Sequence, residues 1–183
     1  MQYSAVTLLT LVSSVLAAPA TQSNVPGFNE KFGIKAYGKG INGINIVATG
    51  DRIFIGGQQF AQCVNNKRAD SATFARYSDD TISLWHTENP TQQLWVGSSS
   101  SGSAEGVVGY ITGNDATPGH DLRSHFKIDQ NGRLTFNGVG AKACPASGNR
   151  YLLYFTNRKL EKGCVDVTLQ TFKTPACVSC LYV

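Results

Sequence analysis

Short runs of β-branched and aromatic residues, separated by Gly, Asn, Asp, Ser and Pro, constrain the fold of this chain more than any other feature of its sequence. Such runs predict β-strands joined by tight turns, whereas the periodicity of an amphipathic helix is hard to find. One turn, Gln130-Asn131-Gly132, contains the Asn-Gly pair that supplies the positive φ of short hairpins. The chain is therefore predicted to be all-β. We expect strands over residues 33–37, 44–48, 52–56, 73–76, 81–86, 93–97, 106–112, 125–128, 133–137, 141–143, 150–156 and 164–172.

A weak internal repeat indicates how these strands are arranged. The segments GDRIFIGG, TQQLWVGS and NGRLTFNG each place a short apolar strand after a turn, and Ile53, Leu94 and Leu134 align at spacings of 41 and 40 residues. Three such repeats and about twelve short strands predict a β-trefoil-like closed barrel, an architecture that leaves few strand edges exposed. A two-sheet β-sandwich and a Greek-key barrel remain alternatives.

The N-terminal segment indicates export. Residues 6–16 read VTLLTLVSSVL, an apolar run that is too short to span a bilayer and that small residues follow. We therefore expect residues 1–17 to be a signal peptide, cleaved after Ala17. Residues 18–31 are polar and contain proline, which predicts a flexible lead-in, and residues 32–183 are expected to form a single β domain. We expect no transmembrane segment in the mature protein.

The charge distribution argues against a nucleic-acid partner. Sixteen Lys and Arg residues against twelve Asp and Glu give a net charge of +4, and the basic residues are scattered along the chain. Nucleic-acid-binding proteins concentrate such charge on one element, with aromatic residues between. We interpret the pairs Lys67-Arg68 and Arg158-Lys159 as solvated loops, with weak attraction to acidic polysaccharide as the alternative.

Five cysteines all follow the predicted signal peptide: Cys63, Cys144, Cys164, Cys177 and Cys180. An exported chain passes through an oxidising compartment, so disulfides are expected, and the odd number leaves one thiol over or paired between chains. The C-terminal C-x-x-C spacing lacks the context of a thioredoxin motif, and zinc would need two further ligands at suitable spacing. We therefore predict no metal site and no cofactor.

The sequence does not predict a catalytic centre. His86, His120 and His125 are the histidines that general acid–base chemistry would need, but nothing in their spacing brings them together. The serine run 98–101 lacks the glycine register and the strand–helix context of a nucleophile elbow, and it is a candidate for O-linked sugar or a flexible hairpin loop.

The most site-like cluster for glycan binding is Trp85 with His86, Glu88 and Asn89, because a large aromatic side chain there precedes a polar turn. The alternative is a core tryptophan beside a hairpin. A second string, Gln93-Leu94-Trp95, matches the Q-x-W motif of ricin-type trefoil lectins, in which the Trp is chiefly structural.

The C-terminal third carries a recognisable block, residues 126–172, with the skeleton A-C-P, then Y-x-L-Y-F, then G-C-x-x-V-T-L. This block resembles the fungal secreted and cell-wall proteins of the PhiA-like type, including related IgE-binding antigens. It is also similar to the cysteine-containing C-terminal domain of yeast wall mannoproteins. The upstream repeats through which those mannoproteins are linked to β-glucan do not occur here, so that linkage is not carried over.

The resemblance implies a secreted, β-rich wall or surface protein without known catalysis. It also implies a Cys144–Cys164 disulfide, which leaves Cys63 to pair with Cys177 or Cys180. We therefore expect a non-catalytic structural or interaction protein, secreted to the extracellular space or cell wall. A lectin-like carbohydrate-binding module and a small secreted hydrolase or ribonuclease are the alternatives. The expected partner is cell-wall polysaccharide or a wall glycoprotein, and the sequence does not set the oligomeric state.

Overall fold

The computed structural model describes residues 25–183 except 89, 116–120, 161 and 175–176, so the predicted signal peptide lies outside the described residues. The described part forms fifteen β-strands and two short 3₁₀ turns, η1 (Val64–Asn66) and η2 (Ser99–Ala104). The strands are β1 (Lys31–Gly38), β2 (Ile41–Thr49), β3 (Arg52–Ile55), β4 (Ala61–Cys63), β5 (Phe74–Arg76), β6 (Ile82–Leu84), β7 (Gln92–Gly97), β8 (Val108–Thr112), β9 (Asp121–Leu122), β10 (Phe126–Ile128), β11 (Arg133–Phe136), β12 (Ala141–Ala146), β13 (Arg150–Phe155), β14 (Val165–Lys173) and β15 (Cys180–Tyr182).

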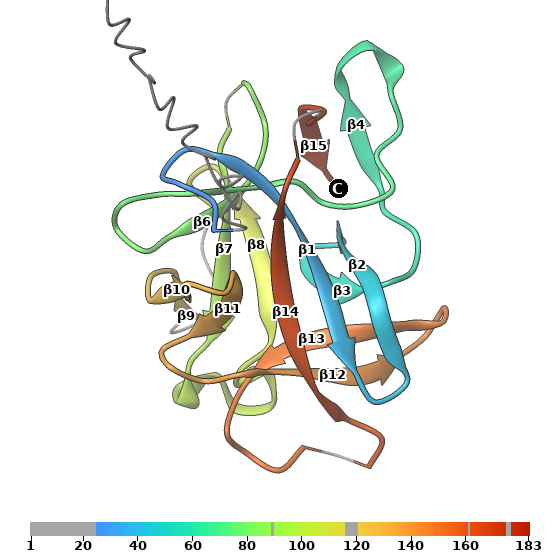
Figure 1. The fold of residues 1–183 in the computed structure, drawn as a ribbon, viewed down its shortest axis with the longest axis vertical. Helices are drawn as coiled ribbons and strands as arrows, with labels where there is room; N and C mark the ends of the chain where they lie inside the picture. The colour runs from blue at the N-terminus through green and yellow to red at the C-terminus, as the bar shows by residue number, and fades with distance from the viewer. Residues whose placement is uncertain (1–24, 89, 116–120, 161, 175–176) are drawn as a thin grey trace, which may run out of the picture.

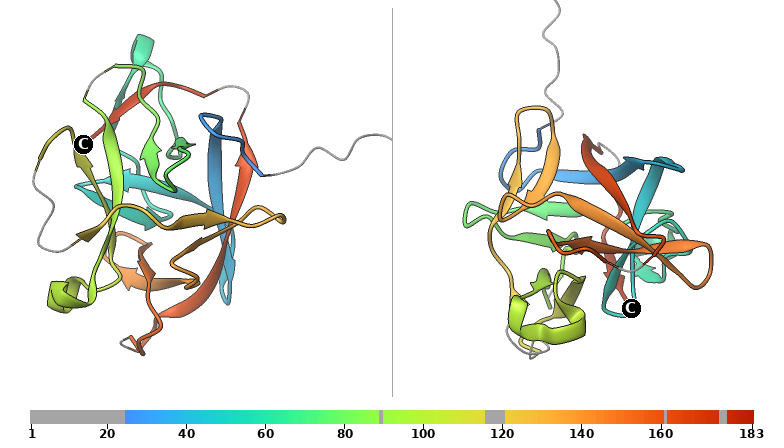
Figure 2. Two further views of the ribbon diagram at one scale, coloured as in Figure 1. Left: turned by 90° about the vertical axis from the view of Figure 1, so that its left-hand side faces the viewer. Right: turned by 90° about the horizontal axis from the view of Figure 1, so that it is seen from below.

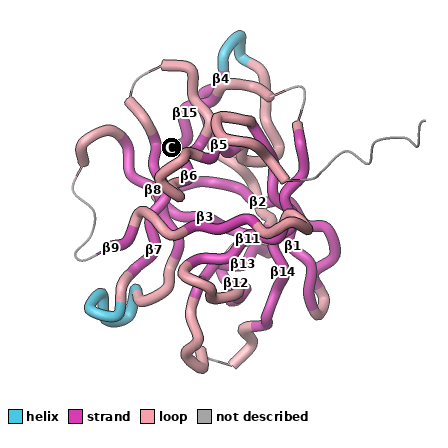
Figure 3. Tube along the Cα trace, turned by 60° about the vertical axis from the view of Figure 1, so that its left-hand side comes forward, coloured by secondary structure: helices cyan, strands magenta, loops and turns pink. Residues whose placement is uncertain are grey.

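The all-β prediction is confirmed. Each of the twelve expected strands matches an observed strand to within three residues at both ends, and β4, β9 and β15 are additional. The views in Figure 2 show strands running in several directions around the body. Figure 3 shows the two 3₁₀ turns on opposite sides of it.

Thirteen strands belong to one antiparallel sheet, and β15 pairs with β4 in a second, two-stranded sheet. The order in the large sheet is β10-β11-β14-β12-β13-β3-β2-β1-β5-β6-β7-β8, with β9 beside β7. Two further pairings, β14 with β1 and β3 with β8, join strands that are distant in this order. The long β14–β1 pair crosses the front of the molecule in Figure 1.

Three hairpins meet one another pairwise: β2–β3, β7–β8 and β12–β13. Arg52 of β3 pairs with Gly109 of β8, and Leu152 of β13 pairs with Phe54 of β3. An isolated bridge from Val107, just before β8, to Tyr154 of β13 completes the set. The turn of the first hairpin has φ of 56° at Gly50 and 59° at Asp51, as a two-residue primed turn requires.

One large hydrophobic core lies inside these strands, and it includes Ile53, Leu94 and Leu134. Ile53 lies in β3, the second strand of the β2–β3 hairpin, and Leu94 lies in β7, the first strand of the β7–β8 hairpin. Leu134 lies in β11, which belongs to none of the three hairpins. The forty-residue repeat predicted from the sequence therefore does not mark equivalent strands, although all three of its residues are core residues.

Strand β14 shows the alternation expected from its sequence. Val167, Leu169 and Thr171 are buried, and Thr168 between them is exposed. Phe172, on the outer face, is accommodated because it lies opposite Gly33 of β1. A Cβ at residue 33 would come within 2.2 Å of the Phe172 ring, so only glycine fits there.

Residues 25–31, which were expected to belong to a flexible lead-in, are held against the sheet. The amide of Asn29 donates to the carbonyl of Arg76 at 2.8 Å, and the Arg76 guanidinium lies 4.9 Å from the centre of the Phe28 ring. Glu30 forms an ion pair with Lys173 of β14 at 3.0 Å. The described part of the expected lead-in therefore contacts the β domain.

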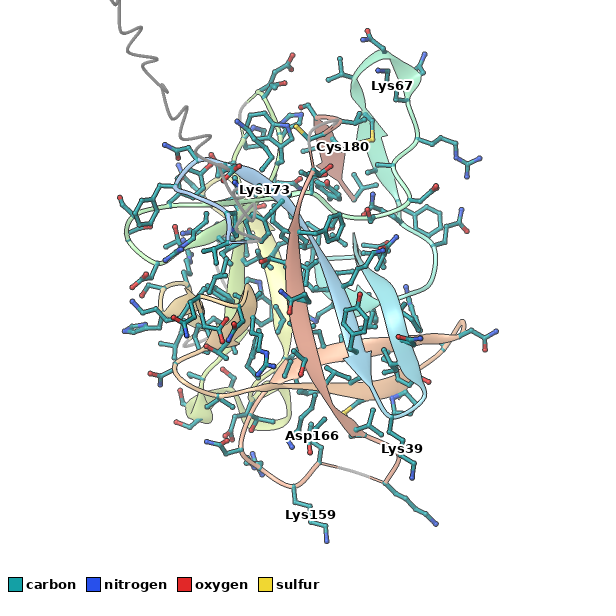
Figure 4. All side chains as sticks on the ribbon, viewed as in Figure 1. Lys39, Lys67, Lys159, Asp166, Lys173 and Cys180 are labelled. Carbon is teal, nitrogen blue, oxygen red and sulfur yellow. A yellow bond between two sulfur atoms is a disulfide. The ribbon has the colours of Figure 1, made fainter. Side chains whose placement is uncertain are left out.

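Two disulfides fix the chain, Cys144–Cys164 and Cys63–Cys180, and Cys177 carries a free thiol. The first is the pair that the resemblance implies. The second shows that Cys63 pairs with Cys180 and not with Cys177. Figure 4 places Cys180 at the end of the molecule opposite Asp166, which is two residues from Cys164, so the two bridges secure opposite ends. None of the described helical segments has the length and apolar character of a membrane span.

Candidate functional site

The loop that follows β6 carries the predicted glycan-binding cluster, and its backbone is fixed from two directions. The Trp85 amide donates to the carbonyl of Thr73 at 2.7 Å, and the Trp85 carbonyl accepts from the Cys180 amide at 3.3 Å. The Thr87 amide donates to the hydroxyl oxygen of Ser179 at 2.8 Å, and the two hydroxyl groups lie 2.9 Å apart. The C-terminal tail thus holds this loop in one place.

The Trp85 side chain is half-buried, and neither hydrophobic cluster of the described residues includes it. The ammonium group of Lys31, which projects from β1, lies 4.1 Å from the centre of its ring. A cation in this position is attracted by the ring face and restrains its orientation. Trp85 is therefore partly accessible, and its ring is restrained by Lys31.

His86 and Glu88 follow Trp85 in the same loop. The Nδ1 atom of His86 is 2.7 Å from the carbonyl oxygen of Glu88. A carbonyl only accepts, so Nδ1 is the donor in this contact. The Glu88 side chain is exposed. Asn89, the fourth residue of the predicted cluster, lies outside the described residues.

Sequence reasoning missed the anchor of this loop, which is a buried glutamine that binds the tail. The Nε2 group of Gln92 donates to the Tyr182 carbonyl at 2.8 Å, and the Tyr182 amide donates back to Oε1 at 2.8 Å. The Tyr182 hydroxyl accepts from the Thr73 amide at 2.9 Å. Burial raises the pKa of Tyr182, and the hydrogen bond from Thr73 opposes that rise. The one feature of the sequence that pointed to an anchored tail was that Cys63 could form a disulfide with Cys180.

The described histidines do not form a catalytic pair. His86 follows β6, whereas His125 precedes β10. Phe126 is the first residue of β10, and its amide donates to the carbonyl of Asp80, which lies just before β6. The two histidines therefore lie toward opposite ends of β6. His120 lies outside the described residues. Glu105 forms an ion pair with Arg158.

The predicted serine loop is structured in part. Ser98 precedes the 3₁₀ turn η2, and its hydroxyl lies 2.8 Å from that of Ser100. The Ser101 hydroxyl donates to Asp121 at 3.2 Å. These contacts fix the loop between β7 and β8.

The tryptophan of the Q-x-W string has a different environment from Trp85. Trp95 is 1% exposed and belongs to a small second cluster with Val107 and Ile111, outside the main core. Its ring lies over Gly109, where a Cβ would approach Cζ2 to 2.4 Å, and Arg52 covers the ring at 4.9 Å. The Trp95 ring therefore packs across β8 at Gly109, and the Arg52 side chain of β3 lies against it.

These features define a disulfide-linked, all-β protein with a surface aromatic loop that its own C-terminal tail fixes. A sequence model of the family described as PhiA-like secreted protein matches residues 32–183. The chain therefore belongs to the PhiA-like secreted protein family.

Named relatives agree with this assignment. A cell wall protein phiA of Emericella nidulans is 29% identical over 183 residues, covering 95% of this chain and 98% of the relative. Proteins with the same name from Arthroderma benhamiae and Aspergillus niger are 30% and 33% identical; the matches cover 96% and 76% of this chain, and 98% and 74% of the relatives. No solved structure gives a significant match. The chain is a secreted fungal cell-wall protein, as the resemblance implied.

Proposed function

We propose that this protein acts in the fungal wall by binding, as a structural or interaction protein, and not by catalysis. The observation that carries the proposal is the half-buried Trp85, held outside the hydrophobic clusters on a loop tied to the C-terminal tail. A rigid frame favours binding because little conformational entropy is lost when a ligand meets a side chain that is already fixed.

The proposed ligand is a wall polysaccharide or the glycan of a wall glycoprotein. The Trp85 ring offers an apolar surface for the C–H face of a sugar, and Lys31 already restrains its orientation. The exposed Glu88 carboxylate supplies an acceptor for sugar hydroxyl groups, and the His86 imidazole supplies a further polar group in the same loop. Asn89 completes the proposed set by sequence.

We also propose that the strands form a β-trefoil-like closed barrel. The pairings β1–β5, β5–β6, β10–β11, β11–β14 and β14–β1 supply five neighbours of a six-stranded ring. The hydrogen bond from the Phe126 amide to the Asp80 carbonyl and the Lys127–Asp80 ion pair support the contact between β6 and β10. The three hairpins that meet pairwise would cap this ring.

The proposed maturation is removal of residues 1–17, followed by oxidation of the single domain that residues 32–183 form. Intact-mass analysis of the secreted protein tests this directly. We expect the mass of a chain that begins at Ala18 and lacks four thiol hydrogens, and a retained leader contradicts it.

Binding is tested by co-sedimentation of the purified mature protein with insoluble β-glucan, chitin and washed fungal walls. We expect retention by at least one wall fraction and a clear loss of retention in Trp85→Ala. The matched control is Phe60→Ala, which removes another aromatic side chain, one that is 50% exposed in a different loop. Equal retention of both variants contradicts the role of Trp85, and hydrolysis of RNA or glycan by the pure protein contradicts the non-catalytic assignment.

A further inference from the structure

The outer face of β1 carries a row of side chains that the hydrophobic core does not use. Alternate residues of this strand from Phe32 to Ala36 are buried, so Lys31, Lys35 and Tyr37 face outward. Lys31 and Tyr37 are six residues apart along an extended strand, so the row is about 20 Å long. Such a length suits an extended chain better than a single small molecule.

The neighbouring strand β14 adds an outward row of its own, beside that of β1 (Figure 1). The pairing of the two strands sets Tyr37 opposite Thr168 and Lys35 opposite Gln170. We call the outward side chains of the two strands the β1 strip: Lys31, Lys35, Tyr37, Thr168, Gln170 and Phe172. Each of them is exposed or half-buried, so a ligand on this face can reach all of them.

Three aromatic rings lie along the β1 strip. The half-buried Trp85 is at one end, where the Lys31 ammonium lies 4.1 Å from its ring centre. Phe172 follows, with the Lys35 ammonium 5.5 Å from its ring centre. Tyr37, at the other end, is 41% exposed. Partly exposed rings in a row offer apolar surfaces to successive sugars of one chain.

Lysines give the strip a positive charge. Lys31, Lys35 and Lys39, the last in the turn after β1, take part in none of the four ion pairs of the described residues. The residues paired with Lys35 are neutral, Gln170 on β14 and Asn45 on β2. Positive groups that no neighbouring carboxylate offsets attract an anionic ligand.

Three carboxylates lie near the ends of the strip, and two of them are already paired. Glu30 forms an ion pair with Lys173, and Asp166 forms one with Lys142. Figure 4 shows Lys173 and Asp166 toward opposite ends of β14. Glu88 is exposed in the Trp85 loop, beyond the end of β1. Three lysines outside the ion pairs against this one carboxylate leave a net positive charge along the strip.

We infer that the β1 strip binds an extended chain of a linear acidic polysaccharide, one with carboxylates on its sugar rings. The lysine ammonium groups pair with those carboxylates, and Gln170 and Thr168 offer hydrogen-bonding groups to sugar hydroxyls. The rings of Trp85 and Tyr37 meet sugar faces at the two ends. This inference rests on the proposed function, because Trp85 is the aromatic residue of that site, and it adds the charge and the length of the ligand.

The test is calorimetric titration of the purified mature protein with three probes: galacturonic acid, its linear hexamer, and a neutral linear glucan hexamer. We expect the acidic hexamer to bind at least about tenfold more tightly than either of the others. Because exposed charges are screened by salt, raising the NaCl concentration from roughly 0.05 to 0.5 M should weaken its binding several-fold.

Two variants test the strip without changing Trp85. Lys35→Gln removes one exposed ion pair and should weaken binding of the acidic hexamer by roughly two- to fivefold. Tyr37→Ala removes the ring at the far end and should weaken it by a similar factor. The matched control is Lys67→Gln, which removes the same charge from an exposed lysine that Figure 4 shows well away from β14, and it should bind as the unaltered protein does. An unchanged urea midpoint shows that each variant is folded.

Three results overturn the inference. They are equal affinity for the acidic monomer and hexamer, equal affinity for the acidic and neutral hexamers, and an effect of Lys67→Gln as large as that of Lys35→Gln. The proposed function fails in a different way, when no wall fraction retains the protein or when Trp85→Ala leaves retention unchanged. Wall retention that depends on Trp85, together with any of the three results, overturns the inference alone.

Discussion

The disulfide between Cys63 and Cys180 is predicted to contribute more to stability than the one between Cys144 and Cys164. The first joins residues 117 apart in sequence and the second joins residues 20 apart. In the chain-entropy model, closing loops of these lengths lowers the entropy of the unfolded chain by amounts worth about 5 and about 3 kcal/mol. Removing the longer bridge should therefore cost about 1.5 kcal/mol more than removing the shorter one.

The structure adds to this difference. Cys180 is fully buried, its amide donates to the Trp85 carbonyl, and its strand β15 pairs only with β4 in the described residues. When the bridge is absent, the tail keeps the Gln92 and Ser179 hydrogen bonds but loses its covalent restraint.

The assay is equilibrium unfolding in urea of two double variants, Cys63→Ala with Cys180→Ala, and Cys144→Ala with Cys164→Ala. Both remove one bridge and leave the other. We expect the first to have the lower free energy of unfolding, and to expose the Trp85 loop to hydrogen exchange. Equal stabilities, or a larger loss in the second variant, would refute the reasoning.

Three further predictions concern packing, the tail and pH. Gly109→Ala should destabilise the fold by about 1–3 kcal/mol through overpacking against Trp95, whereas Gly140→Ala, where a Cβ meets nothing within 4 Å, should have little effect in the same urea titration. Gln92→Leu leaves the amide and carbonyl of Tyr182 buried without partners and should cost about 2–6 kcal/mol, with faster amide exchange across β15; an unchanged urea midpoint would contradict this. Burial raises the pKa of Tyr110 to about 12 in the folded state, from its ordinary value of 10.0. Its contribution to stability is therefore complete below pH 10.0 and is lost as pH rises through about 12; the alkaline loss of stability should be less steep in Tyr110→Phe, and an identical pH dependence in both proteins would count against it.

The sequence predicts the strands well because turn chemistry is local. Gly50, Asp51 and Gly132 mark hairpins through positive φ values that few other residue types adopt, and the alternation in β14 follows from which of its side chains are apolar. The strands β4 and β15 are three residues each and could not be predicted, because distant contacts create them. Those contacts are the Cys63–Cys180 bridge and the hydrogen bonds from Gln92.

The internal repeat was misplaced for a similar reason. Any turn followed by an apolar strand gives the same local pattern, so Ile53, Leu94 and Leu134 align in sequence although they lie in non-equivalent strands. Corresponding strands of the three hairpins instead contain Ile53, Val108 and Leu153, all in the core.

The candidate site was predicted only as a cluster. Trp85, His86 and Glu88 are neighbours in sequence, so their proximity was certain, but whether Trp85 was buried depended on the tail. The stacking of Arg52 on Trp95 was not foreseen, since the ring can lie there only with glycine at position 109 in the next strand.

The central claim is that a folded, disulfide-linked β body binds in the fungal wall without altering it. The most direct measurement compares retention of the oxidised protein on washed fungal walls with retention of the same protein after reduction and alkylation, while released reducing sugar is monitored. The account predicts retention of the oxidised protein alone and no release of sugar. Equal retention of both forms, or release of sugar ends by the oxidised protein, would contradict it.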